Sequence, residues 1–182
     1  EKMGQYTIKK ITKFGLSDFF DYIKTINYGC KDKDGKIHIN QENFSNIAYS
    51  FSSPEEVVKN NCGWCWDIAN LIKYYCKENN IEHKTYFKEY LDTDFHQTHT
   101  QVILKMNNEW FLAPDNLLDI TFGQNGFLSP NECIMNIVAS FTDFLRHALK
   151  EKYEAGNLLL KEFTCAIPSG ISDEEYLSLV RK

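Results

Sequence analysis

The feature that most constrains the fold is an apolar stripe that begins at a cysteine, Cys65. From Cys65 to about Asn79, apolar side chains recur at spacings of three and four residues, which predicts a helix with one buried face. The members of this stripe are Ile68, Ala69, Ile72, Tyr75 and Cys76. Such a helix must be covered by a second layer of structure. We expect the Cys65 thiol, in the first turn, to point into the core with the stripe.

Three strand-like segments follow the helix and can supply that layer. They comprise residues 83–90, 98–106 and 109–113. Asn107-Asn108, between the last two, predicts a tight hairpin turn. We therefore expect the Cys65 helix to pack on an antiparallel sheet.

The pattern changes beyond Pro114. It predicts, in order, a long helix over 129–154, a strand over 158–166 and a terminal helix from Ser172. We find no internal repeat and no linker in the sequence. The economical expectation is one α+β domain over residues 1–182, with its core at about 54–120 and the later helix, strand and helix completing it.

Composition excludes several classes of function. The formal net charge of −5, with Lys and Glu interspersed, argues against a nucleic-acid-binding surface, which needs a basic stripe. No apolar run approaches the ~18 residues that span a bilayer, so we expect no membrane association. The six cysteines follow no disulfide framework, and Glu1-Lys2-Met3 does not resemble a signal peptide. Reduced thiols in a cytoplasmic protein are the expectation.

A histidine at the start of a predicted strand is the natural partner of the Cys65 thiol. His99 lies about 30 residues beyond Cys65, and a lone cysteine paired in space with a distant histidine is a recognised nucleophile signature. A cysteine titrates near 8.5, and a helix amino terminus with a neighbouring imidazolium can lower its pKa to ~3.5–7.5. Asp67 lies on another side of the helix and is expected to favour the helix amino terminus. The sequence thus predicts a nucleophilic thiolate.

The order of motifs resembles a known family. The motifs are Gly63-x-Cys65-x-Asp67-x-Ala69 at a helix start, His99 at a strand start, and Trp110-Phe111 on the next strand followed by an acidic residue. In this order and spacing, the segment from Asn61 to about Asn116 resembles the transglutaminase-like superfamily of papain-like folds. Two outer segments, Tyr28-Gly29 and Ile171 to Tyr176, are also similar to small members of this superfamily from low-GC bacteria. The resemblance implies a central cysteine-bearing helix packed on an antiparallel sheet.

The resemblance also implies a Cys-His-Asp catalytic triad. The family's cysteine is the nucleophile, its histidine the base, and an aspartate on the following strand orients the histidine; here these are Cys65, His99 and Asp115. This chain departs from the pattern because the usual aspartate position is Pro114. A two-residue hairpin loop would set His99 opposite Asn116, with Asp115 facing away. A three-residue loop or a bulge at Pro114 would place Asp115 on the same side as His99. Asn116 is therefore a rival, although a carboxylate stabilises an imidazolium more strongly than an amide.

This chemistry is acyl transfer at a peptide or other amide bond. The thiolate attacks the carbonyl, the imidazole protonates the leaving amine, and water or a second amine resolves the thioester, which gives hydrolysis, deamidation or crosslinking. We prefer hydrolysis because water is always present. The N–H of Cys65 can form half of an oxyanion hole, with Asn60, Asn61 or Lys59 as candidates for the other half. We expect a peptide or protein substrate, no cofactor and no metal; the oligomeric state is open.

Three other interpretations stay open. Cys62, Cys65, His96 and His99 have the ligand types of a structural zinc site, although residues three apart on a strand point to opposite faces. Cys62-Gly-Trp-Cys65 resembles a thioredoxin-type dithiol, although no predicted strand leads into it. The third is a transglutaminase-like fold that has lost its chemistry and binds peptides.

Overall fold

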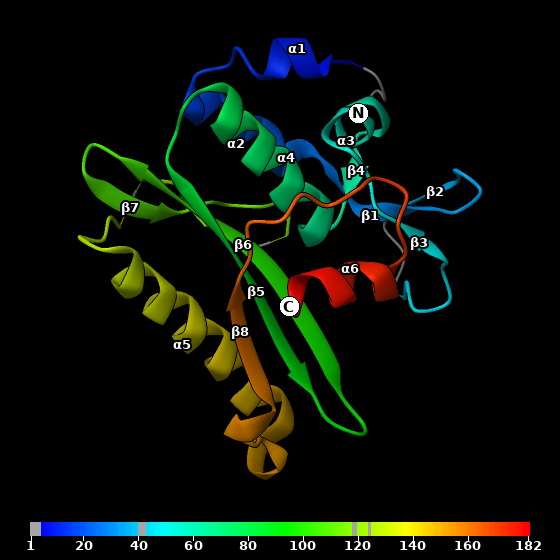
Figure 1. Cartoon of the computed structure of the whole chain (residues 1–182), viewed down its shortest axis with the longest axis vertical. Coiled ribbons are helices and arrows are strands. Elements are labelled where there is room, and N and C mark those ends of the chain that lie inside the picture. The colour runs from blue at the N-terminus through cyan, green and yellow to red at the C-terminus, as the bar shows by residue number, and fades with distance from the viewer. Residues whose placement is uncertain (1–4, 40–42, 118–119, 124) are drawn as a thin grey trace.

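The thiol-bearing helix lies across a four-stranded antiparallel sheet (Figure 1). The computed structural model describes residues 5–39, 43–117, 120–123 and 125–182. The sheet has the order β7-β6-β5-β8. Its strands are β5 (His83–Leu91), β6 (His96–Met106), β7 (Glu109–Leu112) and β8 (Leu158–Glu162). The helix, α4, spans Cys65–Glu78, so the predicted helix and the three strands after it are confirmed.

The apolar stripe of α4 packs on one face of β6. Ile68 and Cys76 are fully buried, and they belong to the same core cluster as Val102 and Leu104 of β6. Successive strand residues point to opposite faces, so Thr100 shares the α4 side with Val102 while His99 and Ile103 share the other. The side on which His99 lies is therefore fixed by the packing of α4.

The hairpin between β6 and β7 has the predicted two-residue loop. Asn107 and Asn108 both have positive φ angles, 53° and 67°, and Met106 pairs with Glu109. Two successive left-handed residues are typical of a tight turn that matches strand twist, and asparagine tolerates this conformation well. The loop sets the register of β6 against β7.

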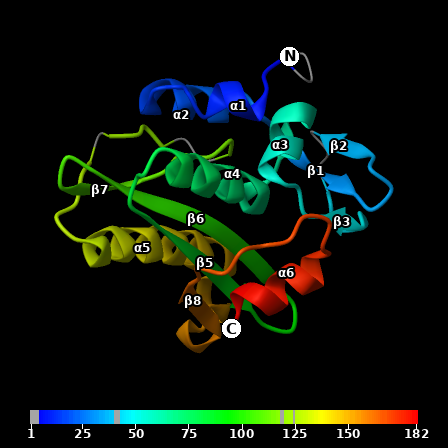
Figure 2. The same cartoon turned by 45° about the horizontal axis from the view of Figure 1, so that its top comes forward.

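A long helix, α5 (Pro130–Leu149), covers the opposite face of the sheet (Figure 2). Cys133 and Ile137 of α5 pack with Tyr86, Ile103 and Trp110. The helix ends at Leu149 and not near residue 154, because Leu149 is the last member of its apolar stripe and Lys150 adopts φ 54°. Two short 3-10 turns follow, η1 (Lys150–Lys152) and η2 (Ala155–Asn157).

Strand β8 is also shorter than predicted. It ends at Glu162 and not at residue 166: Glu162 pairs with Tyr86, and after one further bond, from Phe163 N–H to the Thr85 carbonyl, the chain leaves β5. The predicted terminal helix is α6 (Asp173–Val180), with Ser172 as its cap.

A small second sheet precedes the thiol helix, and the sequence pattern did not predict it. Its strands are β1 (Asn27–Asp32), β2 (Ile37–Ile39), β3 (Tyr49–Ser50) and β4 (Cys62–Gly63), accompanied by α1 (Ile8–Ile11), α2 (Leu16–Thr25) and α3 (Pro54–Asn60). Gly29 permits the close approach of β2, since a Cβ there would lie 2.0 Å from the His38 carbonyl oxygen. The parallel pairing of Tyr28 with Gly63 brings β1 beside the start of α4.

Helix α6 closes the other side of the α4 amino terminus. Tyr176 stacks on Trp66 with ring centroids 4.1 Å apart, and its hydroxyl lies 2.6 Å from Thr100 Oγ1. Arg181 binds the buried carboxylate of Glu89 through Nε at 2.7 Å and through a second contact from Nη2. These contacts hold the C-terminal segment against β5 and β6 near the thiol.

Asp67 joins the first turn of α4 to the chain before it. This carboxylate is fully buried and accepts hydrogen bonds from the Tyr49 hydroxyl (2.6 Å), Ser52 N–H (3.0 Å) and Trp64 N–H (3.1 Å). Its bond to Trp64 serves the helix amino terminus, as expected from the sequence. Burial raises the pKa of Asp67 to about 7, although these three donors favour the ionised form.

We expect Asp67→Ala to destabilise the protein by about 3 kcal/mol, because two buried donors and one partly buried donor lose their acceptor at about 1 kcal/mol each. Tyr49→Phe removes one of the three donors and should cost about 1 kcal/mol. Urea denaturation of both variants tests this. An Asp67→Ala protein as stable as Tyr49→Phe would contradict the assigned role.

Candidate active site

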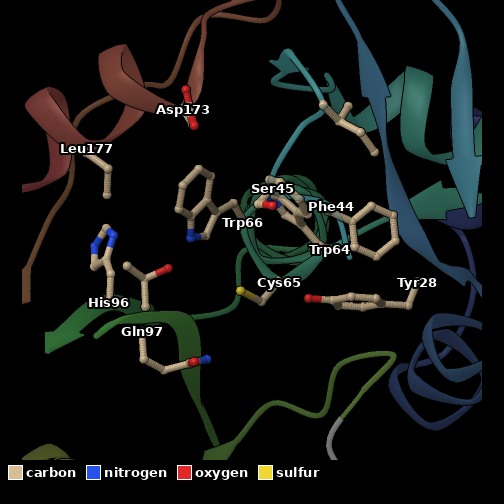
Figure 3. A pocket seen from close by; sticks show the side chains of 12 residues that line it. Tyr28, Phe44, Ser45, Trp64, Cys65, Trp66, His96, Gln97, Asp173 and Leu177 are labelled. Carbon is tan, nitrogen blue, oxygen red and sulfur yellow. The ribbon is translucent and has the colours of Figure 1, made fainter. Parts of the chain in front are cut away.

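The amino terminus of α4 opens into a pocket of about 350 Å³ (Figure 3). The pocket is lined by residues of β1, the loop before β3, the start of α4, the start of β6, and α6. Cys65 is partly exposed and lines this pocket. Contrary to expectation, the thiol does not join the core under the apolar stripe, because the buried stripe begins one turn later, at Ile68; Cys65 packs instead at the edge of a second core cluster that includes Trp66 and Tyr176.

Helix geometry leaves the N–H of Cys65 without an acceptor inside α4. Trp64 is the N-cap residue, with an extended backbone, and its carbonyl accepts the first helical bond from Ile68 N–H (2.9 Å). The first N–H groups of a helix have no acceptor within the helix. Cys65 thus presents both a sulfur atom and a backbone donor.

The Cys65 thiol lies against β6 at the peptide bond that joins His99 to Thr100. The Thr100 N–H is placed to donate to the sulfur and favours the thiolate. Within the described part of the chain, no hydrogen bond joins the sulfur to the His99 ring; the two residues are neighbours across the contact between α4 and β6.

Burial governs the charge of the thiol. It raises the pKa of Cys65 to about 12, because the stabilising Thr100 N–H and the charge of Lys88 are outweighed by desolvation and by the charges of Asp115 and Asp67. The expected low pKa is therefore wrong for the resting site. A helix terminus lowers a thiol pKa by a modest amount. Desolvation of the thiolate by β6 and the pocket walls raises the pKa by more.

His99 and Asp115 lie side by side. The His99 Nε2 and Asp115 Oδ2 atoms are 3.6 Å apart, and Nε2 is buried with no hydrogen-bond partner among the described residues. Burial lowers the pKa of His99 to about 3, and the charge of Lys88 lowers it further. Desolvation is the larger of these two causes. The resting pair is thus a neutral thiol beside a neutral imidazole.

Pro114 explains why Asp115 reaches His99 although the hairpin loop has two residues. The ladder ends where Ile103 pairs with Leu112, with one further bond from Ala113 N–H to the Val102 carbonyl (2.9 Å). Proline has no N–H to continue the ladder, so the chain leaves the strand there. Asp115 then turns toward His99.

Asn116, the rival for the third position, is bonded elsewhere. Its amide donates to the carbonyls of Ile26 (3.2 Å) and Gly63 (2.7 Å). It therefore ties the loop after β7 to the end of α2 and to the residues just before the thiol helix. The structure brings Asp115, and not Asn116, to the imidazole.

The suggested oxyanion residues lie outside the pocket. Asn61 is the left-handed cap of α3 (φ 50°), and its carbonyl accepts from Asn27 N–H at 3.1 Å. Asn60 and Lys59 also do not line the pocket. These residues precede β4, whose pairing with β1 turns them away from the thiol.

Two residues to which the sequence analysis assigned no role at the site lie there. Tyr28 lines the pocket, and Figure 3 shows its hydroxyl directed toward the Cys65 sulfur. Burial, and then the charge of Cys65, raise the pKa of Tyr28, so the hydroxyl stays a donor. No local pattern marks Tyr28, because only its pairing with Gly63 brings it here.

Lys88 is the second unforeseen residue. It is 4% exposed, lies opposite His99 in the β5–β6 ladder, and its Nζ is 3.4 Å from Gln101 Oε1. Burial lowers the pKa of Lys88 to about 8. The feature of the sequence that could have pointed to Lys88 is a lysine within a predicted strand.

The proposed zinc ligands do not converge. Cys62 is buried and its sulfur lies 3.9 Å from the His38 carbonyl, while His96 Nε2 is 2.6 Å from Glu89 Oε2. Among the described residues, no group of three or more ligating side chains could hold a metal ion. The thioredoxin-type reading also fails, because Cys62 is 3% exposed and is not an accessible attacking thiol.

Comparison with known families agrees with this geometry. A family model described as a transglutaminase-like domain matches residues 4–134, which is most of the chain. The chain belongs to the transglutaminase-like domain family. This family lies within the papain-like cysteine enzymes, so the predicted α+β fold with its cysteine-bearing helix is confirmed. No curated protein matches the chain. In the described part of this transglutaminase-like domain, none of the helices has the length and apolarity to cross a bilayer.

We expect the alkylation of Cys65 by iodoacetamide to accelerate about tenfold per pH unit from pH 7 to 9.5, because only the thiolate reacts and the thiol pKa is raised. The rate is measured by mass spectrometry of the Cys65 peptide. Free cysteine, which titrates near pH 8.5, serves as the reference and should level off. A Cys65 rate that is already constant by pH 7.5 would reveal a preformed thiolate and contradict this description.

Proposed function

We propose that this transglutaminase-like domain is a thiol-dependent acyl-transfer enzyme that hydrolyses a peptide or other amide bond. Cys65 is the nucleophile, His99 carries the proton and Asp115 orients the ring. One observation carries the proposal: the Asp115 carboxylate lies 3.6 Å from His99 Nε2, and the thiol lies beside the peptide bond that follows His99.

The neutral state of both groups defines the first step. Because neither group is charged at rest, attack on the carbonyl and transfer of the thiol proton to His99 Nδ1 occur together. The sulfur–carbon bond forms while the carbonyl electron pair moves to oxygen. Asp115, on the Nε2 side, stabilises the imidazolium that results.

Two donors are available to the developing oxyanion. They are the N–H of Cys65, in the first turn of α4, and the hydroxyl of Tyr28, which is directed toward the Cys65 sulfur. Collapse of the intermediate breaks the carbon–nitrogen bond, and His99 gives its proton to the leaving amine. Water, deprotonated by the now neutral His99, then attacks the thioester and releases the acid.

We expect acylation of Cys65 by p-nitrophenyl acetate to depend on His99, since the imidazole accepts the thiol proton. Cys65→Ser should form no thioester, and His99→Gln should slow acylation by about 10²–10⁴-fold. Stopped-flow release of nitrophenolate, with mass spectrometry to locate the acetyl group, measures both.

The control for this experiment is Cys165→Ser, which removes another partly exposed thiol and should leave the acylation rate unchanged. Equal rates in the wild-type and His99→Gln proteins would identify a fold that binds peptides without catalysing this reaction.

Tyr28→Phe tests the oxyanion donor without removing the ring. It should slow acylation by about 10²–10³-fold, the effect of losing one such donor. Alkylation by iodoacetamide forms no oxyanion and should proceed at the wild-type rate. If both reactions slow by the same factor, Tyr28 supports the structure of the pocket and is not an oxyanion donor.

A further inference from the structure

A second cavity lies between the sheet and α5, on the side of β6 away from α4. Its volume is about 310 Å³, at the lower end of the range for small-molecule sites, about 300–1,000 Å³. The sheet contributes Lys88, His99 and Gln101, and α5 contributes Ile137, Phe141 and Phe144.

This cavity and the thiol pocket share a lining residue at the start of β6. Gln97 lines both spaces, Cys65 lines the first and His99 lines the second. Figure 3 shows Gln97 at the border of the thiol pocket. A substrate whose scissile bond sits between Cys65 and His99 can therefore place a group in each space.

The α5 cavity has an apolar lining that extends to the surface. Phe144 is 51% exposed and Leu117 is 59% exposed, and both border the cavity. Exposed large apolar side chains beside a concave site are a feature of ligand-binding surfaces. Most of α5 lies beyond residue 134, where the family match ends.

The chemistry fixes which part of the substrate faces this cavity. The carbonyl oxygen must face Tyr28 and the Cys65 N–H, in the thiol pocket. The leaving nitrogen must face His99, because His99 protonates it as the carbon–nitrogen bond breaks. The part of the substrate attached to that nitrogen then extends toward the α5 cavity.

We propose that the α5 cavity binds an uncharged apolar side chain on the amine side of the scissile amide, a specificity that rests on the proposed function. Lys88 sharpens this specificity. Its buried ammonium forms part of the cavity wall, so a second cation, such as the side chain of lysine, would be repelled. The cavity therefore favours cleavage before leucine-like residues and disfavours lysine as the amine partner.

The test measures binding to a Cys65→Ser protein, which retains the cavities and forms no thioester. N-acetyl-leucinamide, N-acetyl-glycinamide and N-acetyl-lysinamide are titrated separately, and the methyl resonance of Ile137 reports occupancy by NMR. The leucine ligand should bind at least about tenfold more tightly than the glycine ligand, since an isobutyl group is buried. The lysine ligand should bind no more tightly than the glycine ligand.

Two neighbouring surface residues of α5 provide a matched pair of variants. Ser140 borders the cavity, whereas Ala139, also exposed, does not. Ser140→Trp in the Cys65→Ser background should abolish the preference for leucine, and Ala139→Trp should leave it intact. Equal affinity for leucine and glycine, no measurable binding of leucine, or an unaffected Ser140→Trp protein would overturn the proposal.

This binding test is independent of the acylation test. A leucine preference without acylation of Cys65 would support the apolar site and refute the proposed enzyme function. Acylation of Cys65 without a leucine preference would support the enzyme function and refute this inference alone.

Discussion

The packing of α4 against β6 is the contact on which the rest of the site depends. It buries the apolar stripe that starts at Ile68 against Val102 and Leu104, and so holds the first turn of α4 against the peptide bond after His99. The flanking elements are arranged around this contact. β1 pairs with β4 and presents Tyr28, the loop after β7 presents Asp115, and α6 closes the far side through Tyr176.

Enclosure gives the site its electrostatic character. The same burial that positions the thiol raises its pKa, and it lowers the pKa of His99, so both groups rest in the neutral state. In the proposed mechanism, charge separates only when a substrate reacts. Lys88 and Asp115 then lie close enough for their fields to act on the thiolate and the imidazolium that form. A site of this kind protects its thiol from unwanted alkylation and oxidation, since the thiolate is the reactive form.

The sequence predicted the parts of this arrangement that depend on local patterns. The period of the stripe after Cys65 predicted α4, and Asn107-Asn108 predicted the two-residue hairpin. The strands of the small sheet were missed because β2, β3 and β4 have three residues or fewer, too few to show a period, and β1 shows no alternation of buried and exposed residues. Tyr28 was missed with them, because its place beside the thiol follows from strand pairing.

Other features required the tertiary structure. Register alone sets His99 opposite Asn116, and only the departure of the chain at Pro114 turns Asp115 toward the ring. The raised pKa of Cys65 depends on how completely β6 and the pocket walls exclude water, which spacing cannot predict. The catalytic roles of Cys65, His99 and Asp115 stay predictions, as does the single domain over residues 1–182.

The central claim is that the Cys65 sulfur attacks a carbonyl while His99 stands beside it. A crystal structure of the protein treated with a leucine-containing peptide aldehyde tests this most directly, because an aldehyde traps a nucleophilic thiol as a hemithioacetal. We predict a bond from Sγ to the aldehyde carbon, an oxygen bound by the Cys65 N–H and the Tyr28 hydroxyl, and His99 Nδ1 next to the sulfur. An unmodified Cys65, or an adduct with the His99 ring turned away from it, would contradict the account.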